Sequence, residues 1–71
     1  MDRKVAEDIC YMVDGIFEHM QILNNYVVLN CEDASSEKAV HVLTFCVSKL
    51  DLEILEPIYR EYPDLKPAFL P

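Results

Sequence analysis

Hydrophobic residues recur at steps of three and four between Ala6 and Val27, which is the spacing of one face of an α-helix. The seam of this pattern consists of Ala6, Ile9, Val13, Ile16, Met20, Leu23 and Val27. Residues on both flanks are apolar as well, so the apolar stripe covers roughly half of the helix circumference, whereas a two-helix seam needs only about two positions in seven. We therefore expect a single partner helix to leave part of this stripe uncovered.

A second helical pattern follows a polar connection at residues 30–36. Asp33 and Ser35 are candidate N-caps, and Glu37 lies in the first turn, where its charge interacts favourably with the helix dipole. The seam of this second helix consists of Val40, Leu43, Val47, Leu50 and Ile54. The segment 39–47 is apolar nearly all round, which predicts a helix that is buried on most sides.

Together the two patterns predict an all-α fold. Its two long helices, at about 3–30 and 35–56, form an antiparallel hairpin. Pro57 either ends the second helix or occupies the first turn of a short C-terminal helix or turn. The alternative is an α+β chain in the order helix–hairpin–helix, because 26–31 and 40–47 are rich in residues that favour strands.

Three more prolines follow Pro57 and exclude further α-helix, so they predict an extended C-terminal tail. We divide the chain into a single helical domain, 1–62, and a Pro-containing tail, 63–71. A chain of 71 residues that is 52% hydrophobic has enough apolar side chains for a core, but at this size the stability of a single core is marginal.

The cysteines and the hydropathy of the chain bear on its location. Cys10, Cys31 and Cys46 are odd in number and lack paired spacing, which favours free thiols in a reducing compartment. No apolar segment typical of a signal peptide follows the first basic residues, and the longest uncharged runs are too short to cross a bilayer. We expect a cytoplasmic protein that does not contact membranes.

The chain is acidic, with six Lys and Arg against thirteen Asp and Glu, for a net charge of −7. Between Lys4 and Lys38 there is no basic residue, and this interval contains Glu7, Asp8, Asp14, Glu18, Glu32, Asp33 and Glu37. Such a surface repels nucleic acid and attracts a basic protein partner. The simpler interpretation is that the acidic residues keep a hydrophobic chain soluble.

Catalytic chemistry has little support in the sequence. The single glycine excludes a Gly-rich phosphate loop, and no serine has the surroundings of a nucleophile elbow. His19 and His41 do not share a metal-ligand spacing with suitable carboxylates or thiolates. We therefore predict no catalytic residues, no cofactor and no metal, and we interpret the chain as a non-enzyme; a small enzyme is the least favoured alternative.

The remaining class of function is protein–protein interaction, in a regulatory or adaptor role. Because the first stripe is too wide for one partner helix, we predict a homodimer that forms a four-helix bundle with two-fold symmetry. The residues predicted at the interface are Met12, Ile16, Phe17, His19, Met20, Phe45, Tyr59 and Tyr62. The two tyrosines at 59 and 62 either dock a partner or seal the open end of a small core. The alternative function is a phage-type or nucleic-acid-mimicking inhibitor of a basic target protein.

Overall fold

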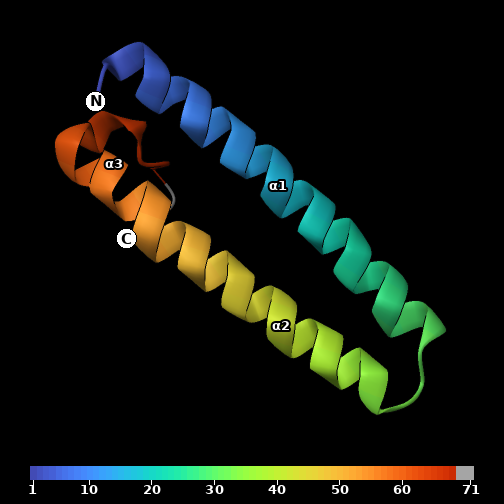
Figure 1. The fold of residues 1–71 in the computed structure, drawn as a ribbon. Helices are drawn as coiled ribbons and strands as arrows, with labels where there is room; N and C mark the ends of the chain where they lie inside the picture. The colour runs from blue at the N-terminus through green and yellow to red at the C-terminus, as the bar shows by residue number, and fades with distance from the viewer. Residues whose placement is uncertain (69–71) are drawn as a thin grey trace.

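The computed structural model of the chain describes residues 1–68, which form a helical hairpin (Figure 1). The elements are α1 (Arg3–Asn30), α2 (Ala34–Leu50), the π-helical segment η1 (Asp51–Leu55), α3 (Glu56–Glu61) and the 3-10 turn η2 (Pro63–Leu65). No strand occurs in this part of the chain, so the predicted all-α hairpin is confirmed. The valine-rich segments that favoured the α+β alternative lie within α1 and α2.

The connection between α1 and α2 follows local rules that the sequence already contains. The backbone becomes extended at Cys31, whose N–H donates to the carbonyl of Val27 at 2.8 Å. Asp33 is the N-cap of α2, and its carboxylate accepts a hydrogen bond of 3.0 Å from the N–H of Ser35. Such a bond satisfies one of the free N–H groups in the first turn of a helix. The predicted cap at Asp33 is therefore confirmed.

Pro57 lies in the first turn of the short helix α3, which is one of the two predicted outcomes, and it does not interrupt the helical segment, because α2, η1 and α3 follow one another directly. Proline lacks an N–H, and in an α-helix its ring clashes with the carbonyl four residues before it. Here the wider π turn precedes the proline, and the N–H of Glu56 donates to the carbonyl of Asp51, five residues back. This turn inserts one residue into the helical repeat. The predicted seam is wrong at Ile54, which is 38% exposed, and Leu55 takes the inward position with 3% of its surface exposed.

The core is small and lies at the end of the hairpin where the N-terminus meets α3 (Figure 1). Its buried residues are Ala6, Val13, Leu55, Ile58 and Tyr59. No side chain of α2 is buried, although the pattern of 39–47 predicted a helix covered on most sides. The reason is that within one chain α2 has a single long neighbour, α1. The half of the hairpin next to the connection therefore has no buried core of its own.

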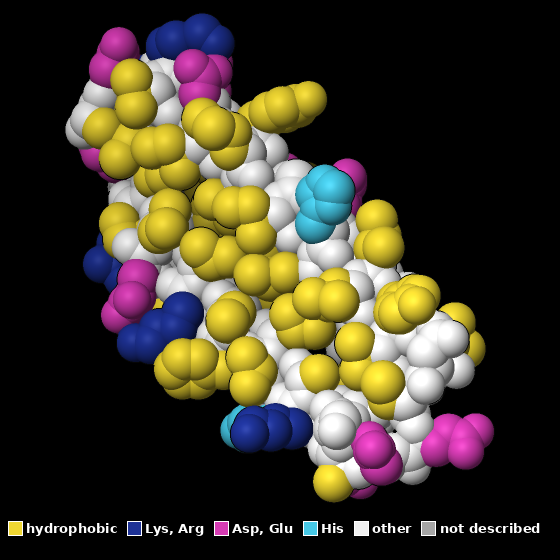
Figure 2. Space-filling view, turned by 45° about the vertical axis from the view of Figure 1, so that its right-hand side comes forward, with side chains coloured by type: hydrophobic (Ala, Val, Ile, Leu, Met, Phe, Trp, Pro, Cys, Tyr) yellow, Lys and Arg dark blue, Asp and Glu magenta, His cyan; other side chains and the backbone are white. Residues whose placement is uncertain are grey.

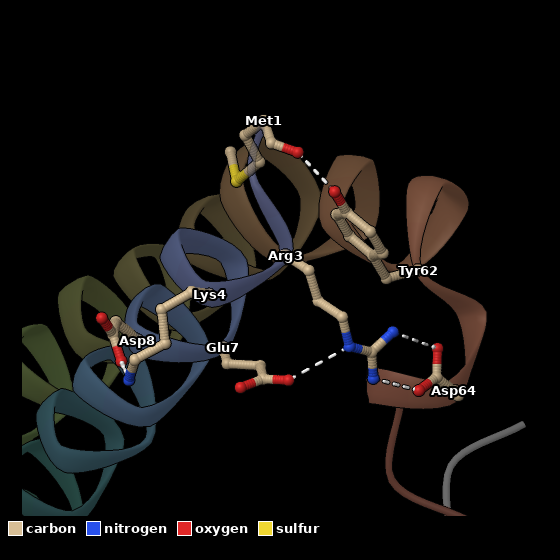
Figure 3. Close-up of polar contacts among 7 residues, drawn as sticks. All are labelled: Met1, Arg3, Lys4, Glu7, Asp8, Tyr62 and Asp64. Atoms are coloured by element: carbon tan, nitrogen blue, oxygen red, sulfur yellow. Dashed lines mark hydrogen bonds and ion pairs between the residues drawn. The ribbon is translucent and has the colours of Figure 1, made fainter.

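Polar contacts tie the beginning of α1 to the end of the chain, and we call this group the terminal clasp: Met1, Arg3, Tyr62 and Asp64 (Figure 3). Arg3 donates to both carboxylate oxygens of Asp64, with an Nη1–Oδ1 distance of 3.2 Å, and its guanidinium carbon lies 5.6 Å from the centre of the Tyr62 ring. The hydroxyl of Tyr62 donates to the carbonyl of Met1. The predicted tail thus starts as a 3-10 turn, and its residues 69–71 lie outside the described part of the chain.

Candidate functional site

The side of α1 that packs on α2 is rotated relative to the predicted seam. The observed line alternates steps of four and three, and consists of Ala6, Cys10, Val13, Phe17, Met20, Asn24 and Val27. Phe17 packs against the core, whereas Ile16 is 42% exposed and Leu23 is 50% exposed. One half of the wide apolar stripe is therefore used within the chain, and the other half remains uncovered.

The other half of the stripe on α1 forms a second regular line, which we call the outer stripe; its side chains are exposed except for Ile9, which is half-buried against the core. It runs at steps of four and three through Val5, Ile9, Met12, Ile16, His19, Leu23 and Tyr26. None of these seven side chains is buried, and none is an acid, a lysine or an arginine. At 1.5 Å per residue the stripe is roughly 32 Å long. Alternating steps of four and three residues form a heptad repeat, which is the pattern by which one helix packs along another.

Residues of α2, η1 and α3 continue the outer stripe on the same side of the hairpin. At the end near the connection, Leu23 of α1 lines a shallow groove together with Ala39 and Val42 of α2. At the opposite end, Ile9 lines a groove with Ile54 and Pro57. Hydrophobic atoms form a band along the length of the molecule on the side shown in Figure 2. We call this surface, which combines the outer stripe with Ala39, Val42, Ile54 and Pro57, the outer face.

Lysines flank the outer face on the α2 side. Helical spacing places Lys38, Val42, Phe45, Lys49 and Leu52 on one line of α2 and of the π segment that follows it. Phe45 is 60% exposed, and the ammonium of Lys49 lies 5.8 Å from the centre of its ring. Lys49 also forms an ion pair of 3.2 Å with Glu53. Two cations therefore lie beside apolar side chains on a chain whose net charge is negative.

The opposite side of the hairpin is more polar. A groove of about 490 Å³ lies there between Phe17 and Met20 of α1 and Val40 and Val47 of α2. Its margin is formed by Gln21, Asn24, Thr44 and Ser48. Side chains that carry hydrogen-bonding groups keep contact with water at this margin. The two sides of the hairpin thus differ, and the outer face is the side on which apolar side chains are least shielded.

The interface residues predicted from sequence fall into three groups. Met12, Ile16 and His19 lie on the outer stripe, and Phe45 lies on the lysine-flanked line of α2. Phe17 and Met20 are half-buried between the two long helices. Tyr59 is buried in the core, and Tyr62 packs against the core and belongs to the terminal clasp.

Leu23, Tyr26 and Val42 belong to the outer face but were not among the predicted interface residues. The signal that identifies them is present in the sequence, since Leu23 and Tyr26 continue the four–three spacing that runs through Met12, Ile16 and His19. Their exposed fractions are 50% for Leu23, 67% for Tyr26 and 50% for Val42. What the spacing alone does not indicate is which half of the wide stripe is turned toward α2.

Groups with chemical reactivity do not converge in the described part of the chain. Within residues 1–68, no three His, Cys, Asp or Glu side chains lie close enough together to hold a metal ion. The three cysteines are free thiols, and burial raises the pKa of Cys10, which lowers the fraction of thiolate, the nucleophilic form. Burial also raises the pKa of Tyr59. These two groups contribute to packing.

Comparison with known proteins gives no relative: no protein-family model, curated protein or solved structure matches this chain. Among the helices of residues 1–68, none combines the length and the apolar character needed to cross a membrane. The outer face is thus the feature of the molecule from which a function can be argued.

Proposed function

We propose that this chain is a small acidic protein that acts by binding other proteins, in a regulatory or adaptor role, and that its basic unit is a homodimeric four-helix bundle. One observation carries the proposal. Within residues 1–68, five hydrophobic side chains are buried, whereas fifteen large hydrophobic side chains are exposed. Monomeric proteins rarely expose extended apolar patches, and such patches are typical of surfaces that bind another protein.

The arrangement of these exposed residues supports a bundle rather than scattered contacts. The outer stripe follows a heptad repeat along the whole of one long helix, and heptad repeats pack in the grooves of neighbouring helices. Two hairpins with their outer faces together would provide four long helices around one common core. In this assembly α2, which has no buried side chain in the single chain, would gain a second neighbour.

Light scattering on a sizing column tests the homodimer directly. At tens of micromolar we expect a mass of twice the 8.2 kDa of one chain. A native pull-down with mass spectrometry, at low and at high salt, then tests the wider role in protein binding. A clean monomer that recovers no specific protein at either salt concentration would contradict the proposed function.

A second candidate is suggested by the acidic residues on the side of α1 away from the outer stripe. Glu7 forms an ion pair with Arg3 at 3.1 Å, and Asp8 forms one with Lys4 at 2.7 Å. Asp14 and Glu18, in contrast, lie in the interval without any basic residue and form no ion pair within the described residues. Such carboxylates favour a basic target protein, as expected of an inhibitor that mimics nucleic acid.

Neutralising these carboxylates separates the second candidate from the first. For a basic partner recovered in the pull-down, the double variant Asp14→Asn/Glu18→Gln should weaken binding, and added salt should weaken it in the same way. Glu53→Gln is the matched control, because Glu53 is already paired with Lys49. Binding that is insensitive both to salt and to the double variant would exclude this candidate and leave the first untouched.

A further inference from the structure

We propose that the outer face binds a second copy of this chain, with the two α1 helices antiparallel and their two-fold axis close to Gly15. This inference rests on the proposed homodimer and assigns its surface and its orientation. The occupant of the outer face is therefore a surface identical to itself, as in every two-fold symmetric interface. Three observations lead to this assignment: the exposed area, the spacing of the outer stripe and the position of the glycine.

The solvent-exposed surface area of the chain is larger than expected of a monomer, by about the area that one partner would cover. The chain exposes 5512 Å² of surface, whereas a folded monomer of its mass is expected to expose only about 4,500 Å². The excess is about 1,000 Å², and a stable interface of standard size buries about 800 Å² on each partner. The elongated shape, 44 × 21 × 16 Å, provides a long side on which this area can be buried. One additional copy is thus sufficient to remove the excess.

The spacing of the outer stripe fits an antiparallel copy of the same helix. A line of alternating four- and three-residue steps matches its own reverse, so two such lines can pack side by side in opposite directions. With the axis between Met12 and Ile16, Met12 of one copy lies beside Ile16 of the other. The same symmetry pairs Ile9 with His19 and Val5 with Leu23. No pair contains an acidic residue, a lysine or an arginine, and the side chains are incompletely covered in the single chain.

Gly15 lies beside the same point, and nothing in the single chain accounts for a glycine there. It is the only glycine of the protein, it lies in the middle of α1, and a Cβ atom at this position would meet no atom within 4 Å apart from its two neighbours in the chain and the backbone of its own helix. A glycine within a helix lowers helix stability relative to alanine. In the proposed dimer the two Gly15 residues lie at the level of the axis, on the flank of the outer stripe, where the absence of side chains lets the two backbones approach closely.

The lysines of α2 favour this orientation over the other two-fold arrangement, in which each α1 packs on α2 of the second copy. Phe17 and Val47 line one groove, so Ile16 and Lys49 lie at nearly the same level of the hairpin. The other arrangement would therefore direct Lys49 of one copy against Ile16 of its partner. Pairing α1 with α1 keeps Lys38 and Lys49 away from the outer stripe of the partner, and their long side chains can extend to water at the margin of the bundle.

The first test places a charge on the outer stripe. Ile16→Asp should raise the dissociation constant of the dimer at least a hundredfold, measured by sedimentation equilibrium. Tyr11→Asp is the matched control, because Tyr11 is 81% exposed on another side of α1, and it should change the constant less than threefold. A dimer that survives Ile16→Asp, with its helix content unchanged by circular dichroism, would overturn the assigned surface while leaving the homodimer itself in place.

The second test fills the space at the axis. Gly15→Leu should leave the single chain folded, because the position is open, and should weaken the dimer at least tenfold. Asn25→Leu adds the same side chain at another exposed position of α1 and should have little effect. Equal dissociation constants for these two variants would contradict an axis at Gly15. If the unmodified protein is a monomer, both the homodimer and this inference are wrong.

The orientation is measured by the distance between spin labels on the two copies. Labels are attached to Leu29→Cys, at a position that is 81% exposed, after the three native cysteines have been replaced by serine and the dimer has been confirmed. Antiparallel α1 helices with the axis near Gly15 place the two labels about 45 Å apart, from the rise of 1.5 Å per residue. A distance below about 25 Å would indicate that the two α1 helices are parallel and at the same level, and would overturn the proposed orientation.

Discussion

The guanidinium of Arg3, in the first turn of α1, binds the carboxylate of Asp64, which follows sixty-one residues later in the chain. Both terminal nitrogens of Arg3 take part, a geometry that matches the two oxygens of a carboxylate. A second contact supports the same junction, since the Tyr62 hydroxyl donates to the Met1 carbonyl. The terminal clasp thus fixes where α1 begins relative to α3, and its Tyr62 packs against the core cluster that contains Ala6 and Ile58.

Asp64→Asn should lower the melting temperature slightly at neutral pH and low salt, and the difference should shrink as salt is added, because the pair is exposed. Arg3 holds the pKa of the Asp64 carboxyl below its ordinary value of 3.8. A pKa that is lower in the folded state stabilises the fold above the unfolded-state value, and this contribution disappears as the pH falls through the folded-state value. Thermal unfolding at pH 7, 5 and 2 checks this. A difference that persists unchanged at pH 2 would rule out the ion pair as its cause.

Leu55→Ala should destabilise the fold far more than Ile54→Ala. Leu55 is 3% exposed and Ile54 is 38% exposed, because the π turn advances the inward position by one residue. Truncation of a buried leucine costs about 2–5 kcal/mol, and truncation of a side chain that is more than one-third exposed should cost clearly less. Urea unfolding of the two variants gives the comparison. The opposite order would indicate that the helix passes Pro57 in regular α geometry.

Alkylation of Cys10 should be several-fold slower in the folded protein than in the protein unfolded in urea. Burial raises the pKa of this thiol, and the negative charge of Asp14 acts in the same direction, so less of the reactive thiolate is present at neutral pH. The rate is followed by mass spectrometry of peptides after timed exposure to iodoacetamide. Equal rates in the two states would show that Cys10 is not shielded by the packing of α1 on α3.

The stability of the protein should depend on its concentration. If the homodimer is the folded unit, unfolding is coupled to dissociation, and a tenfold increase in concentration raises the melting temperature. Differential scanning calorimetry from about ten micromolar upward, a range set by the affinity expected of a standard interface, measures the change. Ile16→Asp provides the control, because its melting temperature should be independent of concentration. An unmodified protein whose melting temperature is constant over this range would argue against a dimer.

Much of the fold could be predicted from local sequence signals. The start of α2 follows from the side chain of Asp33, and most of the extent of α1 follows from an apolar repeat that continues to Val27, one turn before the helix ends at Asn30. Such features depend on residues within one or two turns of each other. Pro57 in the first turn of a short C-terminal helix was one of the two predicted outcomes, and α3 has the proline at its first positions. The π turn that precedes it was not predictable, because no local sequence rule indicates where a helix inserts one residue.

The candidate site was predictable in part. Met12, Ile16 and His19 belong to the apolar stripe that the sequence displays, and the width of the stripe already indicated that one helix could not cover it. Whether Ile16 or Phe17 faces α2 was not predictable, since both are large, apolar and adjacent in sequence. That choice depends on the side chains that α2 and α3 present, which is a property of the assembled hairpin and not of α1 alone.

The position of the core at the terminal end of the hairpin determines the order in which the chain folds. Ala6 and Ile58 belong to one buried cluster although about fifty residues separate them, and the residues around the Asp33 cap bury nothing comparable. A hairpin with its strongest contacts beside the connection can form progressively from that connection, at little cost in chain entropy. Here almost the whole chain must close into a loop before its best contacts form, which slows folding relative to helical proteins with local contacts. Helices that form early reduce the number of conformations the chain samples before Ala6 and Ile58 come into contact. The intrinsic helix stability of α1 and α2 should therefore control the folding rate.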